Sequence, residues 1–211
     1  MIFQSLSDIP YRKEQAIIIN VGTRFVSTLS LLSAIKKADM PVLLVDCPLW
    51  SDDKFDFDYF KLLMKDYDFD LISMPLKNHG ETLDIIFKTL NADYVLLVDS
   101  DLEILNEKIV PLMRKHVTKS NIFGSGFIHG SWWIKETEWE EPRSGLYQER
   151  IWIPFTFLNV KKIREALEVN ISFNARLFYN LIPSNQFISR KLLYLSISEI
   201  SKKLFLSRDR C

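Results

Sequence analysis

Four short apolar runs, each followed by a segment with helical spacing, dominate the first 120 residues of the chain. Continuous apolar runs of this length are typical of strands that are buried on both faces of a parallel sheet. The predicted strands cover residues 16–21, 42–46, 69–76 and 94–98. The segments between and after them repeat apolar positions every three or four residues, which predicts helices over 25–37, 55–66, 81–90 and 107–116. This alternation predicts an α/β fold, in which a mostly parallel central sheet is flanked by helices.

The helical segments also predict which residues face the sheet. In the segment 25–37 the apolar residues that share one helix face are Val26, Leu29, Leu32 and Ile35. In the segment 55–66 the inward residues are Phe57, Phe60, Leu63 and Met64. In the segment 81–90 they are Leu83, Ile86, Phe87 and Leu90.

The pattern changes after Asn121, where the strand–helix alternation gives way to less regular segments. Strands are predicted over 122–128 and 150–157, and between them lies a polar, aromatic segment. A helix over 160–167 is expected to have Asn159 as its N-cap. The last predicted helix, over 189–206, is amphipathic and basic. Because nothing resembles a linker, one domain over residues 1–211 is expected.

The amino-acid composition argues against several classes of protein function. The chain has 211 residues, 47% hydrophobic and 26% charged, with 27 Lys and Arg against 27 Asp and Glu. This balance lacks the basic excess that a nucleic-acid-binding protein shows. The two cysteines, Cys47 and Cys211, have neither zinc-site spacing nor a disulfide framework. With no secretory signal and no apolar run long enough for a membrane span, a cytoplasmic protein is expected.

The candidate chemistry lies at the end of the fourth predicted strand, where the chain reads Asp99-Ser100-Asp101. Open α/β sheets bind ligands at the carboxyl ends of their strands. Two carboxylates placed there suit Mg²⁺ or Mn²⁺, and Mg²⁺ commonly also contacts substrate phosphates. Thr23 and Asp46 follow the first two strands, so they are expected to converge with Asp99 on one cleft. The alternative is an acidic turn that caps the next helix.

The segment around this motif resembles glycosyltransferase family 2, whose members have the GT-A fold. The resemblance covers roughly residues 16–160. It is carried by Asn78-His79-Gly80, the helix that follows, and then Ala92-Asp93-Tyr94 and an apolar run that ends in Asp99-Ser100-Asp101. It implies a Rossmann-like half over 1–120 that binds a nucleotide-sugar, and an acceptor side over 121–211. It also implies that Asp99 and Asp101 hold Mn²⁺ or Mg²⁺ on the donor diphosphate.

Further roles follow from the same resemblance. Asp46 would contact the nucleoside, Thr23 the base, and Asn78, His79 and Gly80 would line the nucleotide cleft. The implied activity is a hexosyltransferase that moves a sugar from a nucleoside diphosphate to a saccharide or glycolipid acceptor in polysaccharide assembly. Candidates for the general base are Glu140, Glu141 and Glu149, whose alternative role is that of solvated surface residues. For Asp46 the alternative is a helix N-cap or a loop residue.

Two other functions stay open. The segment Gly22-Thr23-Arg24-Phe25 resembles the G-x-G-T-R-L loop of sugar nucleotidyltransferases, although it has a single glycine where that loop needs several to surround phosphates. A catalytically inactive GT-A domain that serves in binding or assembly is the second alternative. The basic helix over 189–206 predicts a peripheral contact with the inner face of the cell membrane. Its alternative is packing against the sheet or against a second subunit in a homodimer.

Overall fold

The computed structural model describes residues 1–21, 24–47, 54–75, 79–119, 122–129, 150–169 and 171–173. Within these ranges, the backbone but not the side chains is described for 54–58, 127–129 and 150–152. The chain divides into two compact units, Met1–Phe173 and Asn174–Cys211. All described residues belong to the first unit, so the helix expected over 189–206 lies outside them. One domain over 1–211 stays a prediction.

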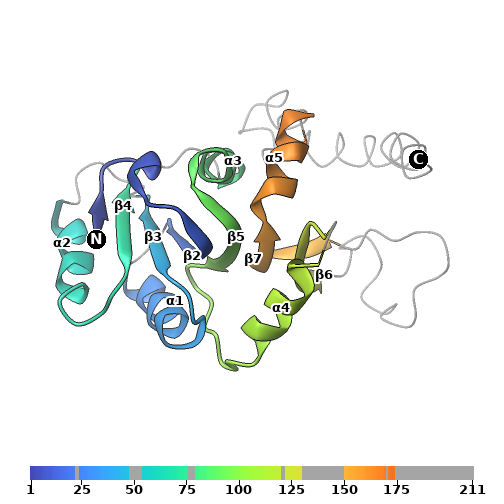
Figure 1. The fold of residues 1–211 in the computed structure, drawn as a ribbon. Helices are drawn as coiled ribbons and strands as arrows, with labels where there is room; N and C mark the ends of the chain where they lie inside the picture. The colour runs from blue at the N-terminus through green and yellow to red at the C-terminus, as the bar shows by residue number, and fades with distance from the viewer. Residues whose placement is uncertain are drawn as a thin grey trace, which may run out of the picture. The chain divides into compact units, whose positions relative to one another are not determined.

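The described strands form one sheet in the order β1-β4-β3-β2-β5-β7-β6 (Figure 1). Their bounds are β1 Ile2–Phe3, β2 Arg12–Asn20, β3 Val42–Asp46, β4 Asp70–Ser73, β5 Ala92–Asp99, β6 Gly124–His129 and β7 Arg150–Asn159. The five strands from β1 to β5 pair in parallel, while β7 runs antiparallel to both β5 and β6. The mostly parallel sheet predicted from the apolar runs is therefore confirmed.

Helices cover both faces of this sheet. They are α1 Arg24–Lys37, α2 Lys54–Leu63, α3 His79–Thr89, α4 Ile109–Val117 and α5 Val160–Glu168, with a 3₁₀ turn, η1, at Leu6–Asp8. In Figure 1, α1, α2 and α4 lie on one side of the sheet and α3 and α5 on the other. Alternate residues of β2 follow the same division, since Ile17 and Ile19 pack with α3, and Ala16 and Ile18 pack with α1 and α4.

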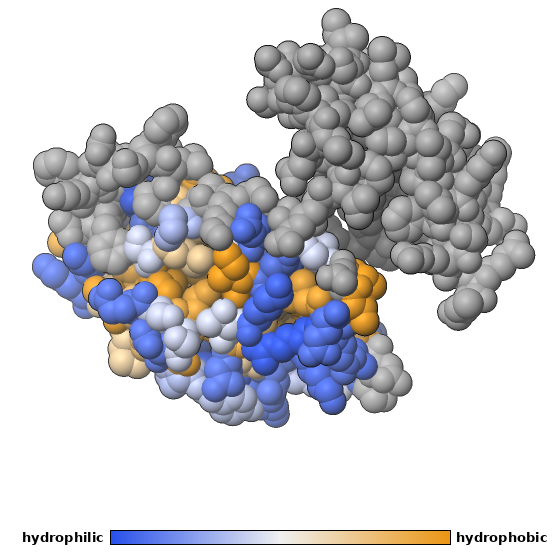
Figure 2. Space-filling model, turned by 90° about the horizontal axis from the view of Figure 1, so that it is seen from above, coloured by the Kyte–Doolittle hydropathy of each residue, from blue (hydrophilic) through white to orange (hydrophobic). Residues whose placement is uncertain are grey.

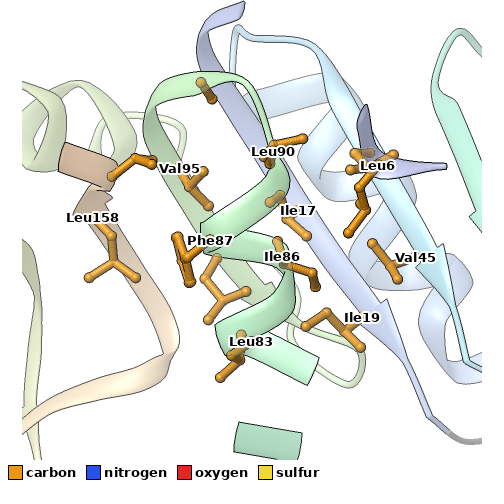
Figure 3. Close-up of a cluster of buried hydrophobic side chains, with 14 of the residues drawn as sticks. Leu6, Ile17, Ile19, Val45, Leu83, Ile86, Phe87, Leu90, Val95 and Leu158 are labelled. Carbon is orange, nitrogen blue, oxygen red and sulfur yellow. The ribbon is translucent and has the colours of Figure 1, made fainter. Parts of the chain in front are cut away.

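The core between α3 and the sheet has the composition that the sequence predicts. Leu83, Ile86, Phe87 and Leu90 are all 3% exposed or less, and they lie against Ile17, Ile19, Val45 and Val95 of the sheet (Figure 3). Viewed from the α3 and α5 side, the described surface has hydrophilic residues between hydrophobic ones (Figure 2). Within the described ranges, every helix is too short or too polar to cross a lipid bilayer.

Several element boundaries differ from the prediction. β2 begins at Arg12 rather than at residue 16, because its polar first residues pair with β5, beginning with Arg12 opposite Ala92. β4 ends at Ser73 rather than at residue 76. β1 and η1 were not predicted at all, because each is only two or three residues long. The cap of α5 is confirmed, since Lys162 N donates to Asn159 Oδ1 at 3.2 Å.

The predicted inner face of α1 is wrong at its first two positions, although Ile35 packs against the core as predicted. Val26 and Leu29 are 41% and 56% exposed, whereas Ser27 and Ser30 are fully buried. The physical reason is hydrogen bonding, because the hydroxyl groups of Ser30 and Ser33 accept hydrogen bonds from main-chain N–H groups of the loop after β5. In α2, Phe60 is buried as predicted, while Phe57 lies outside the described side chains.

Candidate functional site

The carboxyl ends of β3, β2 and β5 lie next to one another at one edge of the sheet (Figure 1). Asn20, the last residue of β2, is opposite Asp46 of β3, and Ile19 is opposite Asp99 of β5. Adjacent strands are about 4.8 Å apart. The main chains at Asp46 and Asp99, with β2 between them, are therefore about 10 Å apart. This edge is where a ligand of a parallel sheet would bind.

Asp46 is enclosed by its neighbours. Its Oδ1 accepts a hydrogen bond from Asn20 Nδ2 at 2.8 Å, and its Oδ2 accepts one from Arg24 Nη2 at 3.1 Å. The Asp46 side chain is 1% exposed and that of Arg24 is 9% exposed. The guanidinium of Arg24 also lies 6.0 Å from the centre of the Phe60 ring. The negative charge of Asp46 is thus balanced inside the protein, and its role as a nucleoside contact stays a prediction.

The local chain course explains why Arg24 reaches Asp46. By the alternation along the strands, Asn20 and Asp46 are on the same face of the sheet as Ile18 and Leu44, the face that α1 covers. Arg24 is the first residue of α1. A cation in the first turn is opposed by the helix dipole, which favours acidic residues there. This unfavourable position is the sequence signal that could have identified Arg24 as the partner of a carboxylate.

Cys47, which follows Asp46, is chemically inert in this setting. The residue is fully buried. Its burial, and to a smaller extent the charge of Asp46, raise the pKa of the Cys47 thiol to about 12. The thiolate is the form that attacks electrophiles and binds metals, and near neutral pH it is essentially absent here. Cys47 is therefore held as a protonated, buried thiol in this setting.

Asp99 and Asp101 have a different environment from Asp46. Asp99 ends β5 and is half-buried, its Oδ1 accepting a hydrogen bond from Ser100 N at 3.0 Å, while Asp101 is exposed. Leu102 N donates to Asp99 O at 3.2 Å, which closes a turn over residues 99–102. Among the described residues no cation pairs with either carboxylate. Two carboxylates without a cationic partner in the described part of the chain thus lie in one turn at the edge of the sheet.

The donor chemistry of this turn fits a hard divalent cation. In the part of the chain that the structure describes, no group of three or more His, Cys, Asp or Glu side chains could enclose a metal. Mg²⁺ does not require such a group, because it typically keeps several waters and binds through one or two carboxylates together with substrate phosphates. Asp99 and Asp101 fit a cation that is shared with a bound diphosphate.

The remaining predicted residues are only partly described. His79 is exposed at the first position of α3, and the half-buried Gly80 follows it. Since α3 comes after β4, the N-terminus of this helix lies on the same side as the carboxyl ends of the strands. Five predicted site residues lie outside the described residues, namely Thr23, Asn78, Glu140, Glu141 and Glu149.

Comparisons with known proteins give distant structural likenesses. Neither a family model nor a curated protein sequence matches the chain. One similar structure is the mannosyltransferase PcManGT from Pyrobaculum calidifontis in complex with GDP-Man and Mn²⁺, with 12% identity, a TM-score of 0.43, and coverage of 57% of this chain and 36% of that one. Another is S. aureus TarS 1–349, with 16% identity, a TM-score of 0.48, and coverage of 79% and 51%. The complex of TarS 1–349 with UDP gives 15% identity, a TM-score of 0.48, and coverage of 76% and 50%.

The chain spans about half the length of TarS 1–349, and less of the mannosyltransferase. With identities of 12% to 16% and TM-scores below 0.5, these likenesses add nothing to the fold and the site described above.

Proposed function

We propose that this chain is a metal-dependent glycosyltransferase, which moves a hexosyl group from a nucleoside diphosphate to a saccharide or lipid-linked acceptor. The observation that carries the proposal is the pair of carboxylates, Asp99 and Asp101, which have no cationic partner among the described residues and lie in one turn after a central parallel strand. The sequence around this turn resembles glycosyltransferase family 2. The neighbouring Asp46 is already paired with Arg24, whereas no described cation pairs with the carboxylates of the Asp99–Asp101 turn.

The chemistry of glycosyl transfer explains why such a turn is needed. The bond between the anomeric carbon and the diphosphate breaks, and negative charge develops on the leaving diphosphate. When bound, a divalent cation would neutralise that charge. Asp99, fixed by its hydrogen bond from Ser100 N, and the exposed Asp101 would be its protein ligands.

Other residues would orient the donor and activate the acceptor. We propose that Thr23, Asn78, His79 and Gly80 line the nucleotide cleft. A glutamate among Glu140, Glu141 and Glu149 would take the proton of the acceptor hydroxyl as the new glycosidic bond forms. We also propose that the basic segment 189–206 contacts an anionic membrane surface when the acceptor is lipid-linked.

The first test measures nucleotide binding with and without Mn²⁺. UDP, GDP and their sugar conjugates are added to the full chain, and the melting temperature is followed. A ligand at about 100 times its Kd stabilises the native state by about 2.7 kcal/mol, so binding is readily detected. We expect a Mn²⁺-dependent rise in melting temperature for one nucleotide class, and its loss in Asp99→Asn and Asp101→Asn.

The matched control is Asp93→Asn. Like Asp99, Asp93 is an aspartate of β5, but it is exposed and lies at the opposite end of the strand, where it accepts a hydrogen bond from Tyr11 Oη at 2.8 Å. This variant should bind like the wild type. Unchanged Mn²⁺-dependent binding in both Asp99→Asn and Asp101→Asn would overturn the proposal.

A second measurement separates the alternatives that the sequence leaves open. Release of nucleoside diphosphate from the bound nucleotide-sugar, with a panel of saccharide and lipid-linked acceptors, indicates glycosyl transfer. Binding without any release indicates an inactive binding module. Release of pyrophosphate from a nucleoside triphosphate and a sugar phosphate indicates a nucleotidyltransferase.

A further inference from the structure

Three side chains of α1 bind the main chain of the loop that follows Asp101. Leu102 N donates to Ser30 Oγ at 3.0 Å, and Ile104 N donates to Ser33 Oγ at 3.1 Å. Lys37 Nζ donates to Ile104 O at 2.7 Å and to Leu105 O at 3.1 Å. These contacts join residues 65 or more positions apart in the sequence, so they fix the loop against α1.

The arrangement accounts for the unusual composition of α1. Residues 30, 33 and 37 follow the three- and four-residue spacing of one helix face. Ser30 is fully buried and Ser33 is 5% exposed, while the apolar Phe25 is 78% exposed. Serine is a poor helix former because its hydroxyl competes for backbone hydrogen bonds. Departures from the usual pattern of apolar residues inside and polar residues outside are expected at functional sites.

The loop contacts act directly on the turn that contains the two carboxylates. The N–H of Leu102 donates to two acceptors, which are Ser30 Oγ and, at 3.2 Å, Asp99 O. This one N–H group belongs to the residue after Asp101 and closes the turn over 99–102. A shift of the loop relative to α1 would therefore change the separation and direction of both carboxylates.

We propose that Ser30, Ser33 and Lys37 are positioning residues, which hold the Asp99–Asp101 turn in the geometry that a divalent cation requires. This inference rests on the proposed function. Groups that orient metal ligands without touching the metal typically contribute 10- to 100-fold to metal affinity. Ser30 is the closest of the three to the turn, and its effect should be the largest.

The test measures the Kd of Mn²⁺ by electron paramagnetic resonance of the free ion, at a saturating concentration of the nucleotide that binds the wild type. We expect Ser30→Ala to weaken Mn²⁺ binding about tenfold. The matched control is Ser27→Ala. Ser27 is also fully buried on α1, but its hydroxyl donates to Arg24 O at 3.0 Å, within the helix. Its removal should leave the Kd of Mn²⁺ unchanged.

A second pair of variants covers the case in which Ser30→Ala does not fold. Lys37→Met removes the two carbonyl contacts of a half-buried side chain, and Lys36→Met on the exposed side of α1 is its control. Hydrogen exchange at the Leu102 amide is measured in parallel. It should be faster in Ser30→Ala than in Ser27→Ala, at equal helix content by circular dichroism.

The outcomes separate the two proposals. If the wild type binds Mn²⁺ and every folded variant of the two, Ser30→Ala and Lys37→Met, binds it equally well, the positioning role is overturned and the proposed function stands. If the wild type binds no Mn²⁺ with any nucleotide, both proposals are overturned. Weaker Mn²⁺ binding in Ser30→Ala or Lys37→Met, with no change in the control variants, supports the positioning role.

Discussion

The ion pair between Arg24 and Asp46 gives a prediction about stability that does not depend on any ligand. Asp46→Asn keeps a side-chain oxygen that can accept from Asn20, but it removes the carboxylate charge that lies 3.1 Å from the guanidinium of Arg24, whose side chain is 9% exposed. Breaking a buried pair by removing one partner costs about 3–5 kcal/mol. We expect the lower end of that range, because the Phe60 ring still faces the guanidinium.

Arg24→Met, the complementary change, leaves the Asp46 carboxylate with the hydrogen bond from Asn20 alone, and a loss of about 3–4 kcal/mol is expected. The double variant, Arg24→Met with Asp46→Asn, removes both charges of the pair together. Replacing both members of a buried pair is often nearly neutral. We therefore expect the double variant to lose about 1–2 kcal/mol relative to the wild type, with a coupling free energy of at least about 2 kcal/mol.

The assay is urea denaturation at 25 °C, followed by tryptophan fluorescence and circular dichroism for all four members of the cycle. A surface pair provides the control cycle, since Lys162 Nζ lies 2.8 Å from Glu165 Oε2 and the two side chains are 32% and 46% exposed. The coupling free energy between Lys162 and Glu165 should be about 0.3–0.5 kcal/mol and should fall with added salt. If the Arg24 and Asp46 variants were additive, or if each cost less than about 1 kcal/mol, the pair would behave as a surface pair and this reasoning would fail.

Two other predictions concern single residues. In a Cys211→Ser background, the stability difference between the Cys47 protein and Cys47→Ala should be constant below pH 9 and fall above it. Above pH 9 the thiol of the unfolded chain loses its proton, while the folded thiol, whose pKa is about 12, keeps it. The stability difference should therefore fall by about 1.4 kcal/mol per pH unit in this range. A difference that does not change with pH would contradict the burial of Cys47. Arg164 donates to two carbonyl groups at the end of α3, at 2.9 and 2.5 Å. Arg164→Met should lower the free energy of unfolding in urea by about 1.5–3 kcal/mol, whereas Lys161→Met, exposed on the same helix, should change it by less than about 0.5 kcal/mol.

The elements that the sequence predicted well are those whose residues face an apolar environment on every side. Residues 42–46 form β3 with the predicted bounds, because a strand between two parallel neighbours is buried on both faces. The inner face of α3 is also correct, since its apolar side chains pack on the apolar side chains of the sheet. The position of Asp99 at the end of β5 follows from the same continuous apolar run.

The features that were missed depend on partners far away in the sequence. The polar start of β2 is stabilised by contacts such as that of Glu14 Oε2 with Arg114 Nε, at 2.7 Å, which no local pattern indicates. The pairing of Asp46 with Arg24 requires α1 to cross over the end of β3, which only the three-dimensional arrangement shows. The buried serines of α1 have the same cause, because the groups that they bind come from a loop some 70 residues further along the chain.

The helix α1 therefore contacts the carboxyl edge of the sheet at two places, Asp46 and the loop after Asp101. At its first residue α1 supplies Arg24, which balances Asp46 at the end of β3. Along its middle and last turns it supplies Ser30, Ser33 and Lys37, whose groups bind the loop after Asp101. None of these three contacts the carboxylates of Asp99 and Asp101, so the loop is fixed without neutralising them. The contacts of α1 thus hold the main chain of this loop, while the two carboxylates keep no cationic partner among the described residues.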